Sequence, residues 1–237
     1  MKFGIVVFPG TWSDTDCYFA VHDILNQDAE YVWHKDTNID KFDCLILPGG
    51  FSYGDYLRPG AMAKLSPIMN SIKEFAMKGK FIIGICNGFQ ILCESGLLPG
   101  TLIKNTTLQF RCQWTNLLVT NNDNPFTNIC TKGSILNIPI SHGEGNYFID
   151  NAGLQKLYKN DQIVLQYSDT NGTINDQSNP NGSVDNIAGI INESHNVIGM
   201  MPHPERSCET ILGSTDGNKI FQSIIRSIEP KLFKEQQ

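Results

Sequence analysis

The chain has 237 residues, a net charge of −6 and a hydrophobic fraction of 41%. This length and apolar content suffice for one sizeable core, so we expect a single domain over residues 1–237. An acidic chain without a basic run is not expected to bind nucleic acid. The opening segment MKFGIVVFPG is broken by Pro9 and Gly10 too early for a signal peptide or membrane span, so we expect a cytoplasmic protein with no membrane partner.

Seven cysteines are present, and no two of them have the C-x-x-C spacing. The sequence therefore predicts neither a zinc site nor a dithiol redox motif, and we expect no metal. In a reducing compartment all of them are expected to be free thiols, most of them small buried side chains. The open question is whether one position makes a thiol reactive.

The first part of the chain alternates apolar runs with segments of helical spacing. The apolar runs predict strands at 2–8, 31–33, 44–47 and 81–85. Apolar residues at helical spacing predict helices at 14–25, 68–76 and 87–94. Short, continuous apolar strands between helices are typical of a parallel sheet covered on both faces. We therefore predict an α/β fold of three layers, with a mostly parallel open sheet between helices.

The middle of the chain has a different pattern. Its apolar segments 110–120, 135–140 and 163–167 are separated by loops rich in Asn, Asp and Gly rather than by helices. We interpret these segments as a more antiparallel extension of the sheet. After the turn-rich stretch QSNPNGSVD, two short strands at 187–191 and 197–200 are expected to form a hairpin, and later apolar residues predict a closing helix.

The stretch Gly84-Ile-Cys86-Asn-Gly88 joins a predicted strand to a predicted helix. Turns of the form G-x-nucleophile-x-G hold a reactive atom on a sharp elbow, because the glycines let the neighbouring backbone approach closely. The helix N-terminus favours the thiolate of Cys86, and the N–H of Asn87 points where an oxyanion would develop. The alternative is that Cys86 is an ordinary buried residue at a strand end.

A thiolate needs a base that also protonates the leaving group, and the segment Met201-Pro-His203-Pro-Glu205 offers one. Residues two apart on an extended segment point the same way, and the prolines stiffen that geometry. A carboxylate bonded to one nitrogen of His203 sets the tautomer and leaves the other nitrogen free for the thiol. The alternative is a proline-stiffened turn with an incidental ion pair. Three other histidines fall where solvated or capping residues are typical: His22, His34 and His195.

A second oxyanion donor is expected at the same edge of the sheet. Pro48-Gly49-Gly50 follows the predicted strand 44–47, and glycine lets a backbone N–H turn inward. The alternative is an ordinary glycine-rich turn. His142, in the stretch SHGEGN, is a further candidate to line the site.

Several motifs together carry a resemblance to a known family. They are PGGFSYGDYLRPGA (48–61), GICNGFQILCESGLLPG (84–100), PISHGEGNY (139–147), NPNGSVDNIAGI (179–190) and MMPHPER (200–206). Over most of its length the chain resembles class I, or triad-type, glutamine amidotransferases. Within that family it is most similar to the small glutaminase subunits of purine biosynthesis, which partner a separate synthetase chain.

The resemblance implies a flavodoxin-like core and a set of site residues. These are the catalytic Cys86, His203 and Glu205, the oxyanion donors Gly50 and Asn87, and the substrate-binding Gln90 and His142. No metal or other cofactor is implied for this chain. One departure concerns Thr11-Trp12-Ser13, where the family usually shows Ser-Asn-Cys, so the role of that loop is open. Arg58, in GDYLR, is either a solvated charge or a contact to the synthetase.

The implied reaction is thiolate attack on the side-chain amide of glutamine, release of ammonia and hydrolysis of a glutamyl thioester. The ammonia passes to a large ATP-using synthetase subunit, with a small bridging subunit being a further candidate partner. That assembly, with ATP and magnesium on the synthetase, converts formylglycinamide ribonucleotide to formylglycinamidine ribonucleotide. The chain itself has no G-x-x-x-x-G-K-[ST] motif, and we expect no nucleotide site in it.

Two other interpretations remain open at this point. PfpI-like enzymes also carry an elbow cysteine, but they typically place a histidine directly after it, whereas Asn87 follows Cys86 here. The second interpretation is that the chain is a non-catalytic binding module on an amidotransferase scaffold. The presence of Cys86, His203 and Glu205 together argues against that loss of activity.

Overall fold

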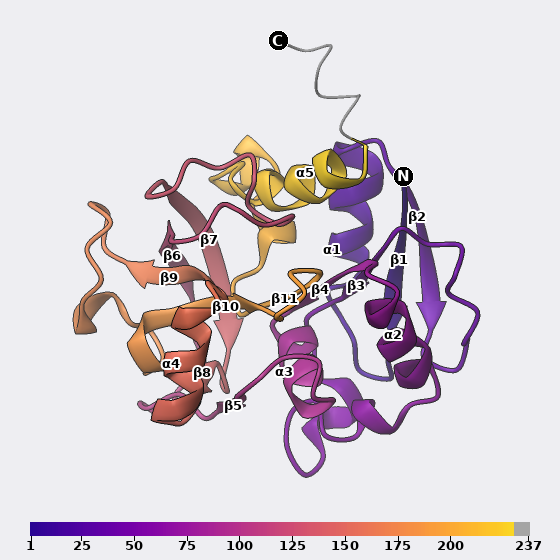
Figure 1. The fold of residues 1–237 in the computed structure, drawn as a ribbon, viewed down its shortest axis with the longest axis horizontal. Helices are drawn as coiled ribbons and strands as arrows, with labels where there is room; N and C mark the ends of the chain where they lie inside the picture. The colour runs from indigo at the N-terminus through magenta and orange to yellow at the C-terminus, as the bar shows by residue number, and fades with distance from the viewer. Residues whose placement is uncertain (230–237) are drawn as a thin grey trace.

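A computed structural model describes residues 1–229 of the chain (Figure 1). A nine-stranded sheet runs through the molecule in the order β2-β1-β3-β4-β11-β10-β9-β6-β7. A separate two-stranded pair consists of β5 (Thr101–Ile103) and β8 (Asn146–Phe148). The large sheet changes character along its width, and the two halves are best described one after the other.

One half of the sheet is parallel. Its strands are β2 (Asp28–Trp33), β1 (Lys2–Val7), β3 (Cys44–Leu47), β4 (Phe81–Ile85) and β11 (Val197–Met200). Neighbours in this set all pair in parallel. The central strands are buried on both faces, as Ile5, Leu45 and Ile82 show by having no exposed surface. Burial on both faces explains their continuous apolar runs and confirms the predicted parallel sheet.

The other half is antiparallel. Its strands are β10 (Ile187–Ile191), β9 (Ile163–Ser168), β6 (Arg111–Val119) and β7 (Ile135–His142). Strand β10 pairs antiparallel with β11 across a short turn, which confirms the predicted hairpin. Strand β7 alternates buried and half-buried residues along its whole length, as expected where one face meets the core. The predicted antiparallel extension of the sheet is therefore confirmed.

Helices cover both faces of the sheet. They are α1 (Asp14–Tyr18), which continues as a π-helical segment Phe19–Ile24, α2 (Ile68–Met77), α3 (Asn87–Glu94) and α5 (Gly217–Ile228). The chain moves from β1 to β2 in one direction across the sheet and from β3 to β4 in the other. Right-handed crossovers therefore place α1 and α2 on opposite faces. Figure 1 shows α5 beside α1 and α3 on the opposite side of the sheet.

One helix was not expected. The segment between β8 and β9, predicted as a loop, contains α4 (Asn151–Lys159). The side chain of Asp150 caps this helix by accepting a hydrogen bond from the N–H of Gly153 at 2.7 Å. Only Leu157 is fully buried, so the apolar spacing that would have indicated a helix is weak.

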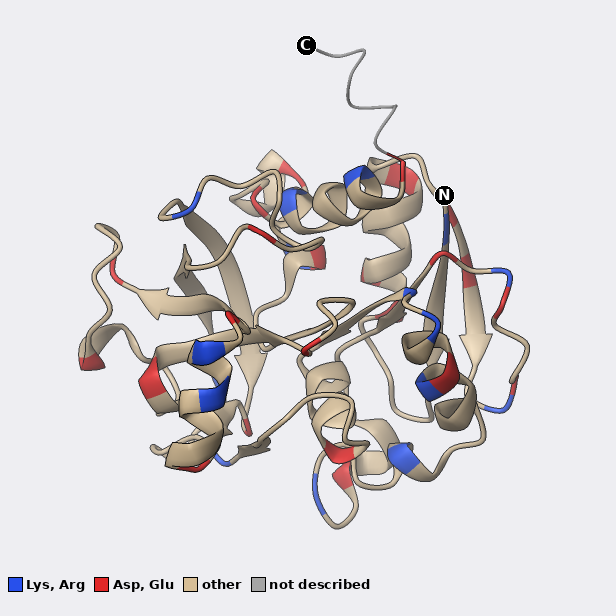
Figure 2. Cartoon of the chain, in the orientation of Figure 1, with Lys and Arg blue, Asp and Glu red and all other residues tan. Residues whose placement is uncertain are grey.

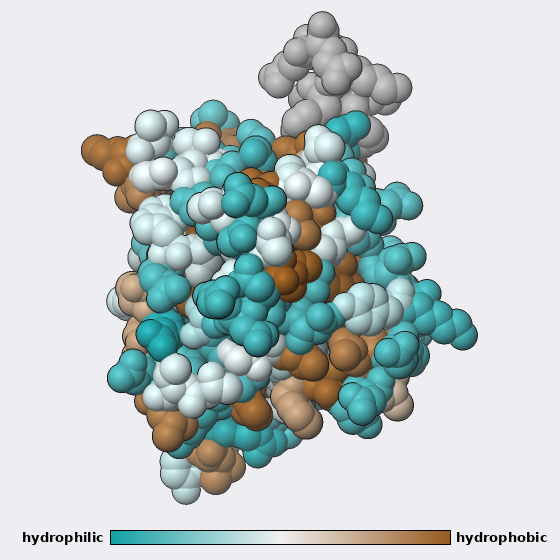
Figure 3. Space-filling view, turned by 90° about the vertical axis from the view of Figure 1, so that its left-hand side faces the viewer, coloured by the Kyte–Doolittle hydropathy of each residue, from teal (hydrophilic) through white to brown (hydrophobic). Residues whose placement is uncertain are grey.

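Charged residues of both signs lie mainly on the outer helices and loops (Figure 2). The side formed by β6, β9 and α4 is largely hydrophilic and is interrupted by separate apolar patches (Figure 3). Within residues 1–229, no helix combines the length and the apolar character needed to cross a membrane.

Candidate active site

The chain makes a sharp turn at Cys86, between the end of β4 and the start of α3. Cys86 has φ 51° and ψ −105°, a conformation that is costly for a residue with a side chain. A Cβ atom on Gly84 would lie 2.7 Å from the Gly88 oxygen, and one on Gly88 would collide with the Leu47 oxygen. Both glycines are therefore needed for strand, elbow and helix to pack this closely.

The thiol of Cys86 lies against β7. Its side chain is 6% exposed, and Sγ donates a hydrogen bond to the backbone oxygen of Ser141 at 3.6 Å. The sulfur therefore faces a polar strand end and is not enclosed by apolar side chains alone.

His203 and Glu205 form a buried pair. His203 Nδ1 lies 2.6 Å from Glu205 Oε1, and both side chains are almost fully buried. The predicted extended geometry was wrong, because Pro204–Arg206 forms a 3₁₀ turn that carries the carboxylate back onto the imidazole. Burial alone would lower the pKa of His203, but the Glu205 carboxylate and Cys86 outweigh it and raise that pKa to about 10.

The fold brings His203 and Cys86 to one place. Strands β4 and β11 are parallel neighbours, so the residues after them meet at the same sheet edge, and the Cys86 N–H donates to the Met200 oxygen at 2.8 Å. A Cβ atom on Gly49 would lie 2.7 Å from His203 Cε1 and 3.5 Å from Cys86 Cβ. Gly49 is therefore flanked by both side chains. Among residues 1–229, His203 Nε2 is buried without a hydrogen-bond partner.

Two backbone N–H groups lie beside the elbow. Gly50 has φ +151°, and a Cβ atom there would lie 2.8 Å from both the Gly10 oxygen and the Thr11 Cα, so only glycine fits. Its N–H donates no hydrogen bond within the described part of the chain. Asn87 occupies the first position of α3, where backbone N–H groups have no acceptor within the helix.

Gln90, on α3, and His142, at the end of β7, both lie at the loop that follows β7. Gln90 Nε2 donates to the Glu144 oxygen at 2.7 Å, and His142 Nε2 lies 3.0 Å from Asn181 Nδ2. Burial, with a smaller contribution from His203, lowers the pKa of His142 to about 3. The His142 imidazole is therefore neutral at physiological pH.

Two asparagines hold the loop that follows His142, and sequence reasoning assigned no role to either. Asn181 Nδ2 donates to the Gly145 oxygen at 2.8 Å, while its Oδ1 accepts from the Ser183 N–H at 3.1 Å. Asn105 Nδ2 donates to the His142 oxygen at 2.9 Å, and its Oδ1 accepts from the Gly145 N–H at 3.0 Å. Asn181 lies in the NPNGS motif, which is the only feature of the sequence that could have indicated its role.

The Thr11-Trp12-Ser13 loop contacts the segment that follows His203. The guanidinium of Arg206 stands 4.9 Å from the centre of the Trp12 ring and donates to Ser13 Oγ at 3.1 Å.

His34, expected to be solvated or capping, is instead buried, and its Nδ1 lies 3.1 Å from the Tyr53 hydroxyl. It supports the loop after β3 rather than meeting solvent.

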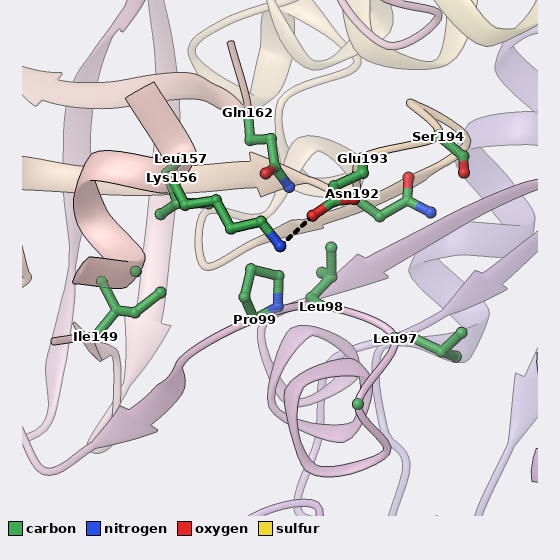
Figure 4. A pocket seen from close by; sticks show the side chains of 12 residues that line it. Leu97, Leu98, Pro99, Ile149, Lys156, Leu157, Gln162, Asn192, Glu193 and Ser194 are labelled. Carbon is green, nitrogen blue, oxygen red and sulfur yellow. Dashed lines mark ion pairs between the residues drawn. The ribbon is translucent and has the colours of Figure 1, made fainter. Parts of the chain in front are cut away.

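Cavities lie both beside and away from this site. A pocket of about 230 Å³ opens at His203 and is lined also by Trp114 and Arg206. A pocket of about 440 Å³, crossed by the Lys156–Glu193 ion pair, contains none of the candidate residues (Figure 4). It lies at the β10–β11 turn, near the start of β4 and away from Cys86. In residues 1–229 no group of three or more His, Cys, Asp or Glu side chains could hold a metal.

Comparisons with known proteins agree with this arrangement. The model of the CobB/CobQ-like glutamine amidotransferase domain matches residues 1–235. A Moorella thermoacetica protein named phosphoribosylformylglycinamidine synthase subunit PurQ is 56% identical over 225 residues, which are 95% of each chain. A protein of the same name from Aquifex aeolicus is 51% identical over 95% of this chain and 99% of its own.

Solved structures give the same picture. A chain in the structure of PurLQS from Thermotoga maritima is 46% identical, with a TM-score of 0.84 over 96% of this chain and 98% of that one. A glutamine amidotransferase, also from Thermotoga maritima, is 13% identical, with a TM-score of 0.55 over 100% of this chain and 85% of that one. The second likeness concerns the fold alone.

Proposed function

This chain belongs to the CobB/CobQ-like glutamine amidotransferase family, and from that premise we propose that it is the glutaminase subunit of a phosphoribosylformylglycinamidine synthase. The observation that carries the proposal is the 56% identity, over 95% of both chains, to a protein of that name. The family match over residues 1–235 supports one amidotransferase domain for the chain. In this role it releases ammonia from glutamine for de novo purine biosynthesis.

In the proposed mechanism the Cys86 thiolate attacks the side-chain carbonyl carbon of glutamine, and the electron pair of the C=O bond moves to oxygen. The N–H groups of Gly50 and Asn87 stabilise that oxyanion. When the C–N bond breaks, His203 Nε2 gives its proton to the departing nitrogen, and ammonia leaves a glutamyl thioester on Cys86. Water, deprotonated by His203, then hydrolyses the thioester to glutamate.

Glu205 keeps His203 protonated beside the thiolate. Its carboxylate lies 2.6 Å from Nδ1 and contributes to raising the pKa of His203 to about 10. An imidazolium next to a thiolate is the pair needed at the start of the reaction. Gln90 and the neutral His142 serve in the glutamine pocket, where an uncharged imidazole adds no competing cation.

The proposed partner is the large ATP-using synthetase, and the PurLQS assembly suggests a small third chain beside it. ATP and magnesium belong to the synthetase, and thiol chemistry requires no cofactor in this chain. Exposed aromatic residues near the site offer it a surface, since the Trp12 and Phe51 rings lie 6.4 Å apart and are 55% and 46% exposed. Free cysteines throughout residues 1–229 fit a cytoplasmic location.

The test uses a glutamine-like diazo-ketone, which alkylates a nucleophile within a glutamine pocket, followed by mass mapping. We expect modification of Cys86 alone and protection by glutamine. In the assembled synthase, Cys86→Ser should lower glutamine-dependent synthesis at least about 10⁴-fold and leave ammonia-dependent synthesis intact. The control is Cys93→Ser, on the same helix, whose thiol donates to the Pro99 oxygen at 3.6 Å. Labelling at another thiol, or labelling that glutamine does not slow, would contradict the proposal.

A further inference from the structure

Three hydrogen bonds, two of them buried and one partly buried, join the two loops on either side of the elbow. The Ser52 N–H donates to Asn87 Oδ1 at 3.2 Å, Asn87 Nδ2 donates to Gln90 Oε1 at 2.9 Å, and Gln90 Nε2 donates to the Glu144 oxygen at 2.7 Å. Ser52, Asn87 and Gln90 are each at most 6% exposed. One loop follows β3 and the other follows β7, so the chain of bonds crosses the site along the first turn of α3.

The direction of every bond in this relay is determined by its ends. A backbone N–H only donates, so Asn87 must turn its oxygen toward Ser52. A backbone carbonyl only accepts, so Gln90 must turn its nitrogen toward Glu144. The middle bond then runs from Asn87 Nδ2 to Gln90 Oε1 with no alternative, and flipping either amide breaks two bonds. The relay therefore specifies one arrangement of both loops.

The loop after β3 has reason to need this restraint. Ser52 stands two residues after Gly50 and is followed by Tyr53, Asp55 and Leu57, whose φ angles of 55°, 54° and 68° are unfavourable for residues with side chains. On the side away from α3, the loop is held by the Phe51 N–H, which donates to the Gly10 oxygen at 2.9 Å. Without the bond to Asn87 the loop keeps this attachment and the exposed Arg58–Glu94 ion pair, but it loses the buried bond that fixes its distance from the elbow.

We propose that the Asn87 side chain is a positioning residue for the oxyanion site. Acting with Gln90, it sets the Gly50 loop and the Glu144 loop at the distance from Cys86 that the reaction requires. Its backbone N–H and its side chain then serve the same oxyanion, one directly and one through Ser52. This inference rests on the proposed glutaminase function and extends it to a group that has no contact of its own with the reacting atoms.

The first test is Asn87→Ala in the assembled synthase. Loss of the restraint on the Gly50 loop should lower kcat for glutamine hydrolysis by about 10²-fold, the effect of misplacing one oxyanion donor. Alkylation of Cys86 by iodoacetamide forms no oxyanion, so its rate should stay within about twofold of wild type. Ammonia-dependent synthesis should not change. An unchanged kcat, or an equal loss in hydrolysis and alkylation, would show a merely structural role and overturn the inference.

Two matched variants test the relay link by link. Asn87→Asp keeps the acceptor for the Ser52 N–H and removes the donor to Gln90, whereas Gln90→Glu keeps the acceptor for Asn87 and removes the donor to Glu144. Each should raise KM for glutamine by about tenfold and lower kcat less than Asn87→Ala does, because the Gly50 loop stays anchored. In a cycle of Asn87→Ala, Gln90→Ala and their double variant, which introduces no charge, the two effects should be clearly less than additive.

These results also separate the inference from the function beneath it. Wild-type synthase that hydrolyses no glutamine would refute the proposed function itself. If wild type is active, two outcomes would refute the relay and leave the proposed function intact. One is a kcat for Asn87→Asp as low as that for Asn87→Ala, and the other is additive effects in the double variant.

Discussion

The parallel strands β3 and β4 reach the site with their ends, whereas the antiparallel strand β7 borders it with a loop that side chains hold in place. On the parallel side, Cys86 and Gly50 owe their positions to backbone conformations that glycine neighbours permit. On the antiparallel side, the loop after His142 is fastened by Asn105 and Asn181. In the proposed mechanism, the backbone thus places the reacting atoms, and hydrogen bonds place the wall proposed to receive substrate.

The two sides of the site also differ in the pKa of the buried histidine that each one carries. His203 and His142 are 1% and 3% exposed, so burial disfavours the charged form of both. Yet the pKa of His203 is raised to about 10 and that of His142 is lowered to about 3. The partner decides the outcome, since His203 faces the Glu205 carboxylate and His142 faces the Asn181 amide. Replacing the carboxylate partner by an amide, or the amide by a carboxylate, should therefore reverse the direction of the pKa shift.

Glu205→Gln should give the largest effect, because it makes His203 resemble His142. Without the carboxylate, burial lowers the pKa of His203, the imidazolium is lost at neutral pH, and kcat for glutamine hydrolysis should fall by about 10³-fold or more. NMR titration of His203 is the direct measurement. A raised pKa that persists in the variant would mean that Cys86, and not Glu205, holds the charge.

The same substitution should change how stability depends on pH. The raised pKa of His203 contributes to the free energy of unfolding fully below its unfolded value near 6.5, and this contribution is lost as pH rises toward 10. Wild type and Glu205→Gln should therefore differ most at pH 6 and converge near pH 10 in urea unfolding. A difference that does not vary with pH would be a packing effect instead.

The elbow could be read from the sequence because its cause is local. Gly84 and Gly88 flank Cys86 within one turn, and the steric demand that they meet is made by neighbouring backbone. The strands could be predicted from the sequence equally well. Strands buried on two faces have continuous apolar runs, and strands buried on one face alternate apolar and polar residues. Even the His203–Glu205 pair was found by spacing, although the turn that forms it is not extended.

The asparagines were not readable in the same way. Asn181 bonds to Gly145 and His142, both more than thirty positions away in the chain, and Asn105 reaches the same loop from the other direction. In sequence such residues look like ordinary turn formers. The weakly apolar α4 was missed for a related reason, because its cap and its single fully buried leucine, Leu157, give little periodic signal.

Asn181→Asp tests the antiparallel wall by the reciprocal exchange. A carboxylate beside His142 should raise the pKa of that histidine from about 3, while the lost donor to the Gly145 oxygen should cost about 1–3 kcal/mol of unfolding free energy. We expect a higher KM for glutamine with a smaller change in kcat, because the wall moves and the reacting atoms do not. The measurements are steady-state kinetics, urea unfolding and NMR titration of His142.

The matched control is Asn171→Asp, which makes the same chemical change at an exposed loop position. It should change stability by no more than about 0.5 kcal/mol and leave both kinetic constants alone. If Asn181→Asp lowered kcat and left KM unchanged, the division between a reacting side and a receiving side would fail.

The smallest effect is expected from Arg58→Ala, at the other end of the strained loop after β3. The loop is tied to α3 twice, through the buried bond from Ser52 to Asn87 and through Arg58, whose Nε and Nη2 donate to Glu94 at 2.6 and 2.8 Å. The Arg58 side chain is 56% exposed, so solvent and salt weaken its pair, and its loss should cost less than about 1 kcal/mol. Urea unfolding at low and high salt, with Lys64→Ala as the control for the second cation on Glu94, measures this. A larger loss that high salt does not reduce would mean that the exposed tie, and not the buried one, bears the strain of the loop.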